Sequence, residues 1–270
     1  MFAFINKNRL NSTKAVDEIE KTVYEYLKPF GFQKHGRTLH RFVDGDISQI
    51  VHFQNGSASK KNYDVLWVNL GIRVPESAEH KFLISSPQKK YYREYECNIR
   101  NRLGVLVNGR DTVYHLKKNP HKIGKDIVKK LSQYVIPVFE TLNSRDAILN
   151  HRQEYVHFDE MHNDLILLDD AMIYGRKGNI KQAEKLFNLY YQKERKRYKY
   201  DYEHGSKIYL RKGERVTYHN ARTNQSETIV AKKSGFVVLY DAQRKHLEYL
   251  EQLAKELNIK ISEKYEHETS

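Results

Sequence analysis

Apolar residues recur every three or four positions near the start of the chain, which indicates a helix with one buried face. They are Val16, Ile19, Val23, Leu27 and Phe30. The polar residues 11–13 are candidates for the N-terminal cap. Gly31 follows the last apolar position, where glycine commonly ends a helix in the left-handed conformation. The pattern predicts a first helix from residue 11 to residue 30.

The next apolar residues follow the period of two that is typical of strands. Two such runs, 38–43 and 46–54, flank Asp44-Gly45, a pair that strongly favours a β-hairpin turn. A third run, 63–74, is apolar on both faces, so we expect it to be the central strand, ended by Pro75.

The second run places its apolar residues unevenly on its two faces. Ile47, Val51 and Phe53 share one face, whereas Ser48 and His52 lie on the other. We therefore expect one face of the sheet to be largely exposed to water.

Helical periodicity returns between Val128 and Leu142, with an expected kink at Pro137. A strand candidate, 112–116, precedes it. We predict that residues 11–150 form an α+β domain, an antiparallel sheet packed with helices.

The second half of the chain, residues 151–262, has mainly helical patterns. Two of them lie on either side of a glycine turn at 175–179 and predict an αα-hairpin over 163–200. For residues 201–240 we predict a β-like or irregular insertion. Leucines at helical spacing then predict a final helix at 241–257. We find no second copy of the hairpin at a fixed period, which argues against a solenoid.

The charge balance favours an acidic partner. The 270 residues include 47 Lys and Arg against 34 Asp and Glu, for a net charge of +13. Either an acidic protein or a nucleic acid would complement that charge, although a solvated lysine-rich surface also explains it.

We predict the cellular compartment from features that the sequence lacks. The only cysteine, Cys97, cannot form an intramolecular disulfide or a cysteine-clustered zinc site. The apolar start within Met1–Leu10 is too short for a signal peptide, and no apolar run approaches the length of a membrane span. A cytoplasmic protein without membrane association is expected.

Several short motifs along the first half occur in a recognisable order. They are Gly31-Phe32, Gly36-Arg37-Thr38, Arg41, Phe53-Gln54, Val68-Asn69-Leu70-Gly71, Cys97, Arg102-Leu103-Gly104 and Asp111. In this order they resemble the bacterial family named domain of unknown function 4304, over the N-terminal 150 residues. One departure is Val113-Tyr114, where family members tend to have a Trp-rich strand. The resemblance implies an α+β fold and no particular reaction or catalytic residue.

Polar residues cluster on the predicted strands. They are His40, Arg41, Gln49, His52, Gln54 and Asn69. Strand alternation places His52 and Gln54 on one face and Gln49 on the other, so they cannot form a single site. The functional interpretation is a polar groove for a peptide or nucleotide, and the alternative is cross-strand hydrogen bonding on an exposed face.

A set of arginines is the preferred candidate for ligand binding. It comprises Arg37, Arg41, Arg100, Arg102 and Arg110. A converging set would bind an anion, because arginine makes paired hydrogen bonds to carboxylates and phosphates. The alternative is structural ion pairs with Asp44, Asp111 or Glu96.

Two further clusters were weighed. The first is a basic run at a predicted helix end, which would contact nucleic acid. The alternative is a solvated helix end. The run comprises Lys193, Arg195, Lys196, Arg197 and Lys199. His157 and His162, with carboxylates between them, are candidate metal ligands, but their spacing differs from the helical His-Glu-x-x-His arrangement.

Phosphate-binding loops, dinucleotide-binding glycine motifs and the Gly-x-Ser-x-Gly elbow are all missing from the sequence. We therefore expect a binding protein without catalytic activity or cofactor, whose partner is an acidic protein. An immunity- or defence-associated role is one hypothesis. A nucleic-acid-binding protein is the alternative, and a metal-dependent hydrolase is a weaker one.

Overall fold

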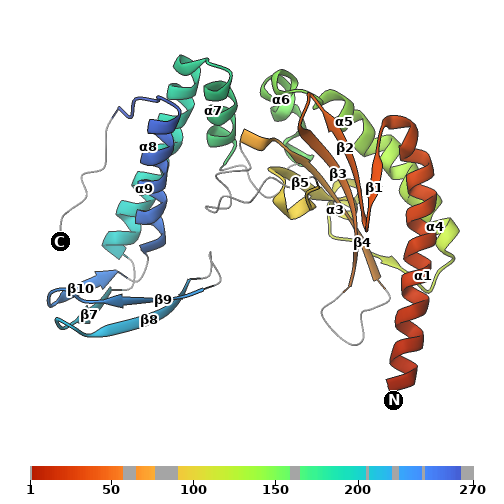
Figure 1. Ribbon diagram of the computed structural model, residues 1–270, viewed down its shortest axis with the longest axis horizontal. Coiled ribbons are helices and arrows are strands. Elements are labelled where there is room, and N and C mark those ends of the chain that lie inside the picture. Colours follow the sequence, from red (N-terminus) through yellow and green to blue (C-terminus); the bar gives the residue numbers. More distant parts are fainter. Residues whose placement is uncertain are drawn as a thin grey trace. The chain divides into compact units, whose positions relative to one another are not determined.

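The computed structural model divides into two compact units, Met1–Asp169 and Asp170–Ser270 (Figure 1). It describes residues 2–56, 65–76, 91–158, 165–204, 207–220, 225–238 and 241–262. The division lies later than the predicted boundary at residue 150. The buried ion pair between Arg152 Nη1 and Asp169 Oδ2, 3.0 Å long, ties the residues up to Asp169 to the first unit.

The first unit is built on an antiparallel sheet, as predicted. Its strands are β1 (Gln33–His35), β2 (Thr38–Val43), β3 (Ile47–Asn55), β4 (Val65–Arg73), β5 (Ile99–Arg102) and β6 (Tyr114–His115). The order is β1-β2-β3-β4-β5, and β6 also pairs with β4. β4 was predicted to be the central strand; it is an interior strand, with β3 on one side and β5 and β6 on the other. Asp44 and Gly45 have positive φ angles of 46° and 84° in the β2–β3 turn, which explains why this pair forms the hairpin.

Helices of the first unit pack on one face of this sheet (Figure 1). They are α1 (Phe2–Leu27), α4 (Pro120–Lys130) and α5 (Ile136–Thr141), with a π turn at Leu131–Val135 between the last two. The predicted apolar stripe of α1 is fully buried from Val16 to Leu27. The stacked rings of Phe32 and Phe139, 6.1 Å apart, join the start of the sheet to α5.

The start of α1 is a correction to the sequence prediction. The helix begins at Phe2, so residues 11–13 lie inside it and do not cap it. Neither glycine nor proline occurs between Phe2 and Leu27 to interrupt the helix. Its end agrees with the prediction: a 3-10 turn, Lys28–Phe30, leads to Gly31 at φ 88°.

The expectation that the other sheet face is largely exposed was wrong. Ser48 and Ile50 on this face are both fully buried. Residues 91–98, which include the 3-10 turn η2 (Glu94–Glu96), cross this face, so that Ile50 packs with Tyr92 and Cys97. A Cβ on Gly71 would lie 2.5 Å from Cys97 Sγ, so glycine is needed where this segment meets β4.

Shorter helices complete the first unit. They are α3 (Leu103–Asn108), α6 (Arg145–His151) and the 3-10 segment η4 (Arg152–Phe158). Arg145 at the start of α6 fixes the β2–β3 turn, since its guanidinium contacts Asp44 at 3.2 Å and Asp46 at 2.7 Å.

The second unit has the predicted helical hairpin. Its helices are α7 (Ile166–Arg176), α8 (Ile180–His204) and α9 (Asp241–Glu256). Gly178, at φ 79°, lies in the turn between α7 and α8. Between α8 and α9 the chain forms β7 (Lys207–Leu210), β8 (Arg215–Asn220), β9 (Gln225–Val230) and β10 (Gly235–Val238). β7 pairs with β10 and β8 with β9, both antiparallel.

Candidate functional site

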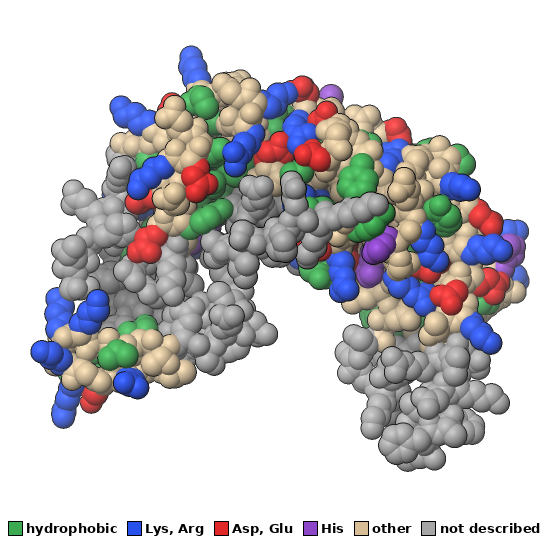
Figure 2. Space-filling view, viewed as in Figure 1, with side chains coloured by type: hydrophobic (Ala, Val, Ile, Leu, Met, Phe, Trp, Pro, Cys, Tyr) green, Lys and Arg blue, Asp and Glu red, His purple; other side chains and the backbone are tan. Residues whose placement is uncertain are grey.

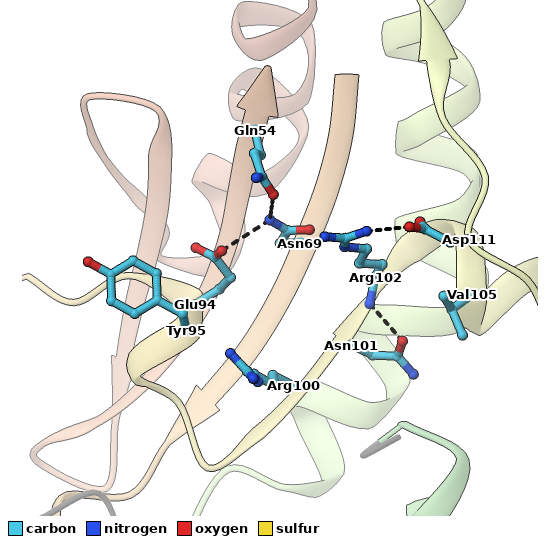
Figure 3. A pocket seen from close by; sticks show the side chains of 9 residues that line it. All are labelled: Gln54, Asn69, Glu94, Tyr95, Arg100, Asn101, Arg102, Val105 and Asp111. Atoms are coloured by element: carbon cyan, nitrogen blue, oxygen red, sulfur yellow. Dashed lines mark hydrogen bonds and ion pairs between the residues drawn. The ribbon is translucent and has the colours of Figure 1, made fainter. Parts of the chain in front are cut away.

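A pocket of about 610 Å³ opens on the sheet face that residues 91–98 cross (Figure 3). Its lining residues are Gln54, Asn69, Glu94, Tyr95, Arg100, Asn101, Arg102, Val105 and Asp111. The volume is within the range of ordinary ligand pockets.

Strand register explains why distant polar residues meet in this pocket. In the sheet, His52 pairs with Asn69 and Asn69 pairs with Arg102. Cross-strand partners share a face, and so do residues two apart on one strand. Gln54 and Arg100 therefore lie on the same face as Asn69 and Arg102.

Amide and carboxylate groups form the centre of the pocket. Asn69 Nδ2 donates to Gln54 Oε1 at 2.8 Å and to Glu94 Oε1 at 3.1 Å. Asn69 Oδ1 and Glu94 Oε2 are buried and accept no hydrogen bond from the described residues. His52 Nε2 lies 3.8 Å from Glu94 Oε2. Two buried acceptors beside the pocket thus have no donor among the described residues.

The two pocket arginines differ in their partners. Arg102 forms an ion pair with Asp111, and its guanidinium lies over the Trp67 ring, 5.6 Å from the centroid. Arg100 makes no hydrogen bond or ion pair with any residue that the structure describes, and its Nε is buried (Figure 3). A buried donor without a partner is costly.

A second pocket, of about 520 Å³, lies on the same face toward β2, and Gln54 lines both. Thr38 Oγ1 and His52 Nδ1 are 2.8 Å apart, and His40 Nε2 donates to the Tyr92 carbonyl at 2.6 Å. Burial lowers the pKa of both His40 and His52 below the ordinary histidine value. Both rings are therefore favoured in the neutral form.

The five predicted arginines do not converge on one site. Arg37 reaches α1, where it contacts Asp17 at 2.9 Å and Glu20 at 3.4 Å. Arg41 lies on the opposite sheet face from the pocket, and Arg110 is exposed outside the pocket lining. Only Arg100 and Arg102 meet in the pocket.

The polar strand residues divide between the faces, as strand alternation requires. Arg41 and Gln49 lie on the helix-covered face, where Arg41 Nε donates to Gln49 Oε1 at 2.7 Å. His40, His52, Gln54 and Asn69 lie on the pocket face.

Sequence reasoning missed Glu94 and Tyr95. They lie in a stretch dense in tyrosine and charge, without helical or strand periodicity. The alternation of tyrosine and glutamate at 94–96 was the only local signal. It could not place these residues over β4.

The remaining candidates lie elsewhere or outside the description. The basic run Lys193–Lys199 lies within α8, which continues to His204, so it is not a helix end. Arg197 in that run pairs with the buried Glu194 at 3.2 Å. The side chains of His157 and His162 lie outside the described residues, and no metal-ligand cluster occurs among those that are described.

Fold and site together define an α+β domain with a mixed-charge pocket on its sheet. Residues 23–141 match the model of the family described as a domain of unknown function (DUF4304), which confirms the resemblance found in the motifs. Four of the motif residues line the pocket: Gln54, Asn69, Arg102 and Asp111. No curated protein and no solved structure matches the chain. Within the described residues, no helix is long and apolar enough to cross a membrane.

Proposed function

We propose that this is a cytoplasmic bacterial binding protein without catalytic activity, and that its sheet pocket binds an acidic segment of a protein partner. The observation behind the proposal is Arg100, a pocket arginine without a partner among the described residues. A carboxylate from the partner would complete its hydrogen bonding in paired geometry.

The acceptors beside Arg100 favour a peptide over a simple anion. A peptide presents a carboxylate side chain together with backbone N–H donors. Asn69 Oδ1 and Glu94 Oε2 are buried acceptors that such donors would satisfy. Glu94 disfavours a phosphate more than a carboxylate in this pocket, because a phosphate monoester carries up to two negative charges and a carboxylate only one.

The net charge of +13 supports the same type of partner. An excess of positive charge accelerates encounter with an acidic protein at low ionic strength. The pocket then provides the specificity that overall charge lacks.

The Thr38 hydroxyl of the second pocket is a poor nucleophile candidate. Thr38, the hydroxyl residue beside His52, is only 6% exposed. Its contact with His52 joins directly opposite residues of β2 and β3, which is an ordinary cross-strand pair. This arrangement supports a binding function.

Binding to an array of short acidic peptides tests the proposal. The proteins compared are the wild type, Arg100→Met and Arg110→Met, the last of which removes the same charge outside the pocket. We expect Arg100→Met to bind its best acidic peptides about 10-fold to 100-fold more weakly, because a charged hydrogen bond contributes about 1.5–3 kcal/mol.

Arg110→Met is expected to retain the peptide preference and affinity of the wild type. Equal losses in the two variants would mean that overall charge, and not the pocket, determines binding. Failure of the wild type to prefer acidic peptides over their amide counterparts would also refute the proposal.

A further inference from the structure

The strands of the second unit form one bent ribbon. β7 pairs with β10, and β8 pairs with β9. Between these ladders, Gly213 N donates to Ala231 O at 2.7 Å and Ala231 N donates to Glu214 O at 2.9 Å. Lys212 N also donates to Ser234 Oγ at 3.0 Å. Residues 211–214 and 231–234 are therefore held side by side as the bend of a two-stranded ribbon.

Positive charge gathers at this bend, and Figure 2 shows Lys and Arg side chains around the ribbon. Five exposed cations come from the two adjoining segments: Arg211, Lys212, Arg215, Lys232 and Lys233. None of these five makes an ion pair with a described residue. Glu214 Oε2 accepts a hydrogen bond from the backbone N–H of Arg211 at 2.8 Å, so this carboxylate stabilises the turn.

The ribbon contributes much of the chain's net charge. Residues 207–238 contain seven Lys and Arg against two Glu. The pocket of the first unit does not use this charge, so the ribbon requires its own explanation.

One face of the β8–β9 ladder is open. Arg215 pairs with Val230, and Thr217 pairs with Thr228, and all four side chains are exposed. The two threonine hydroxyls are 2.9 Å apart. Exposed hydroxyls and cations on one ribbon face are the groups that proteins use to contact phosphate oxygens.

We propose that this ribbon binds the phosphate backbone of double-stranded DNA. A two-stranded β-ribbon fits the major groove of B-form DNA, which is about 12 Å wide. The corresponding groove of A-form RNA is too narrow and deep for such an element. Duplex DNA is therefore the nucleic acid that the ribbon's shape fits best. The site lies in the second unit and shares no residue with the pocket of the first.

Fluorescence anisotropy with a labelled DNA duplex of about 20 base pairs tests this inference on the full chain. Each phosphate that the protein neutralises contributes about −0.9 to the slope of log affinity against log salt. Lys232→Gln/Lys233→Gln is expected to weaken binding at least 10-fold and to reduce that slope by about 1.8.

The matched control is Lys122→Gln/Lys125→Gln, which removes the same charge from exposed positions of α4. We expect it to change affinity less than twofold and to leave the slope intact. Circular dichroism of both variants verifies that the fold is retained.

Three results would overturn the proposal. The first is the absence of duplex DNA binding at low salt. The second is an equal effect of the two double variants, which would show attraction by net charge alone. The third is equal or tighter binding to an RNA duplex, to polyglutamate or to anionic phospholipid vesicles, which would assign the ribbon to another ligand.

Discussion

Arg41 and Arg100 lie on opposite faces of one sheet and have opposite surroundings. Arg41 Nε donates to Gln49, and its Nη1 reaches Phe30 O at 3.3 Å and Glu140 Oε1 at 2.5 Å. Arg100 makes no such contact with the described residues. The same residue type thus belongs to a hydrogen-bond network on one face and has no described partner on the other.

Gln49 extends the network on the helix-covered face. Its Nε2 donates to Phe139 O at 2.6 Å and to Leu142 O at 3.3 Å. Arg41 and Gln49 therefore connect β2 and β3 to the end of α5. Two arginines of one sheet therefore differ in their partners among the described residues, although their residue type is the same.

The largest expected effect is on the helix-covered face. Arg41→Met should lower the free energy of unfolding by about 3 kcal/mol, because it removes charged hydrogen bonds and leaves buried acceptors without donors. Arg100→Met should change it by less than about 0.5 kcal/mol. Urea unfolding followed by circular dichroism measures both. Similar losses of unfolding free energy in the two variants would show that Arg41 and Arg100 contribute equally to the fold.

A smaller effect is expected where residues 91–98 cross the pocket face. Gly71→Ala places a Cβ 2.5 Å from Cys97 Sγ and 2.9 Å from Cys97 Cβ, so the crossing segment must shift. We expect a loss of about 2 kcal/mol in unfolding free energy. Weaker acidic-peptide binding should accompany it, because Glu94 belongs to the same segment.

Gly235→Ala is the matched control, since a Cβ there meets no atom within 4 Å. An unchanged stability and peptide affinity in Gly71→Ala would show that residues 91–98 do not shape the pocket.

The smallest effect concerns the pH dependence of stability. Burial lowers the pKa of His40 from its usual 6.5, so between the folded and unfolded pKa values the unfolded chain binds more protons. The free energy of unfolding then rises with pH through that window and falls as the solution is acidified below about pH 6.5. In His40→Gln the free energy of unfolding should depend less steeply on pH in this window. The slope should be lower by at most about 1.4 kcal/mol per pH unit.

Glu20 on the helix side acts in the opposite direction. Burial raises the pKa of its carboxyl above 4.5, so its stabilising contribution is present at low pH and is lost as pH rises. In Glu20→Gln the free energy of unfolding should therefore fall more steeply on acidification than in the wild type. His40→Gln should have the opposite effect. Urea titrations between about pH 5 and pH 7.5 measure both slopes, and changes of the same sign in the two variants would contradict this assignment.

Strands β2, β3, β4 and β6 could be predicted because their signals are local, whereas the sequence analysis predicted no strand at β1 or β5. Asp44-Gly45 specified the hairpin, and the apolar residues on both faces of 63–74 placed β4 in the interior of the sheet. The helical hairpin around Gly178 and the final helix could also be predicted from short-range periodicity.

The pocket could not be predicted, because it depends on pairing between distant segments. Arg100 reaches it through the register of β5 on β4, in which Gly71 lies opposite Arg100. Glu94 arrives from a turn without periodicity that packs over the sheet through Cys97. Local patterns contain neither relation, so Arg41 and Arg100 looked equivalent in the sequence.

The most direct test of the central claim observes the Arg100 side chain itself. Nitrogen-15 NMR can follow the arginine Nε–H resonances while a blocked Ala-Glu-Ala peptide is added, with Ala-Gln-Ala as the control. The resonance absent from Arg100→Met is assigned to Arg100. We predict that it shifts saturably with the glutamate peptide and not with the glutamine peptide, while the Arg41 resonance stays in place. A glutamate-dependent shift at other arginines with none at Arg100 would contradict the account.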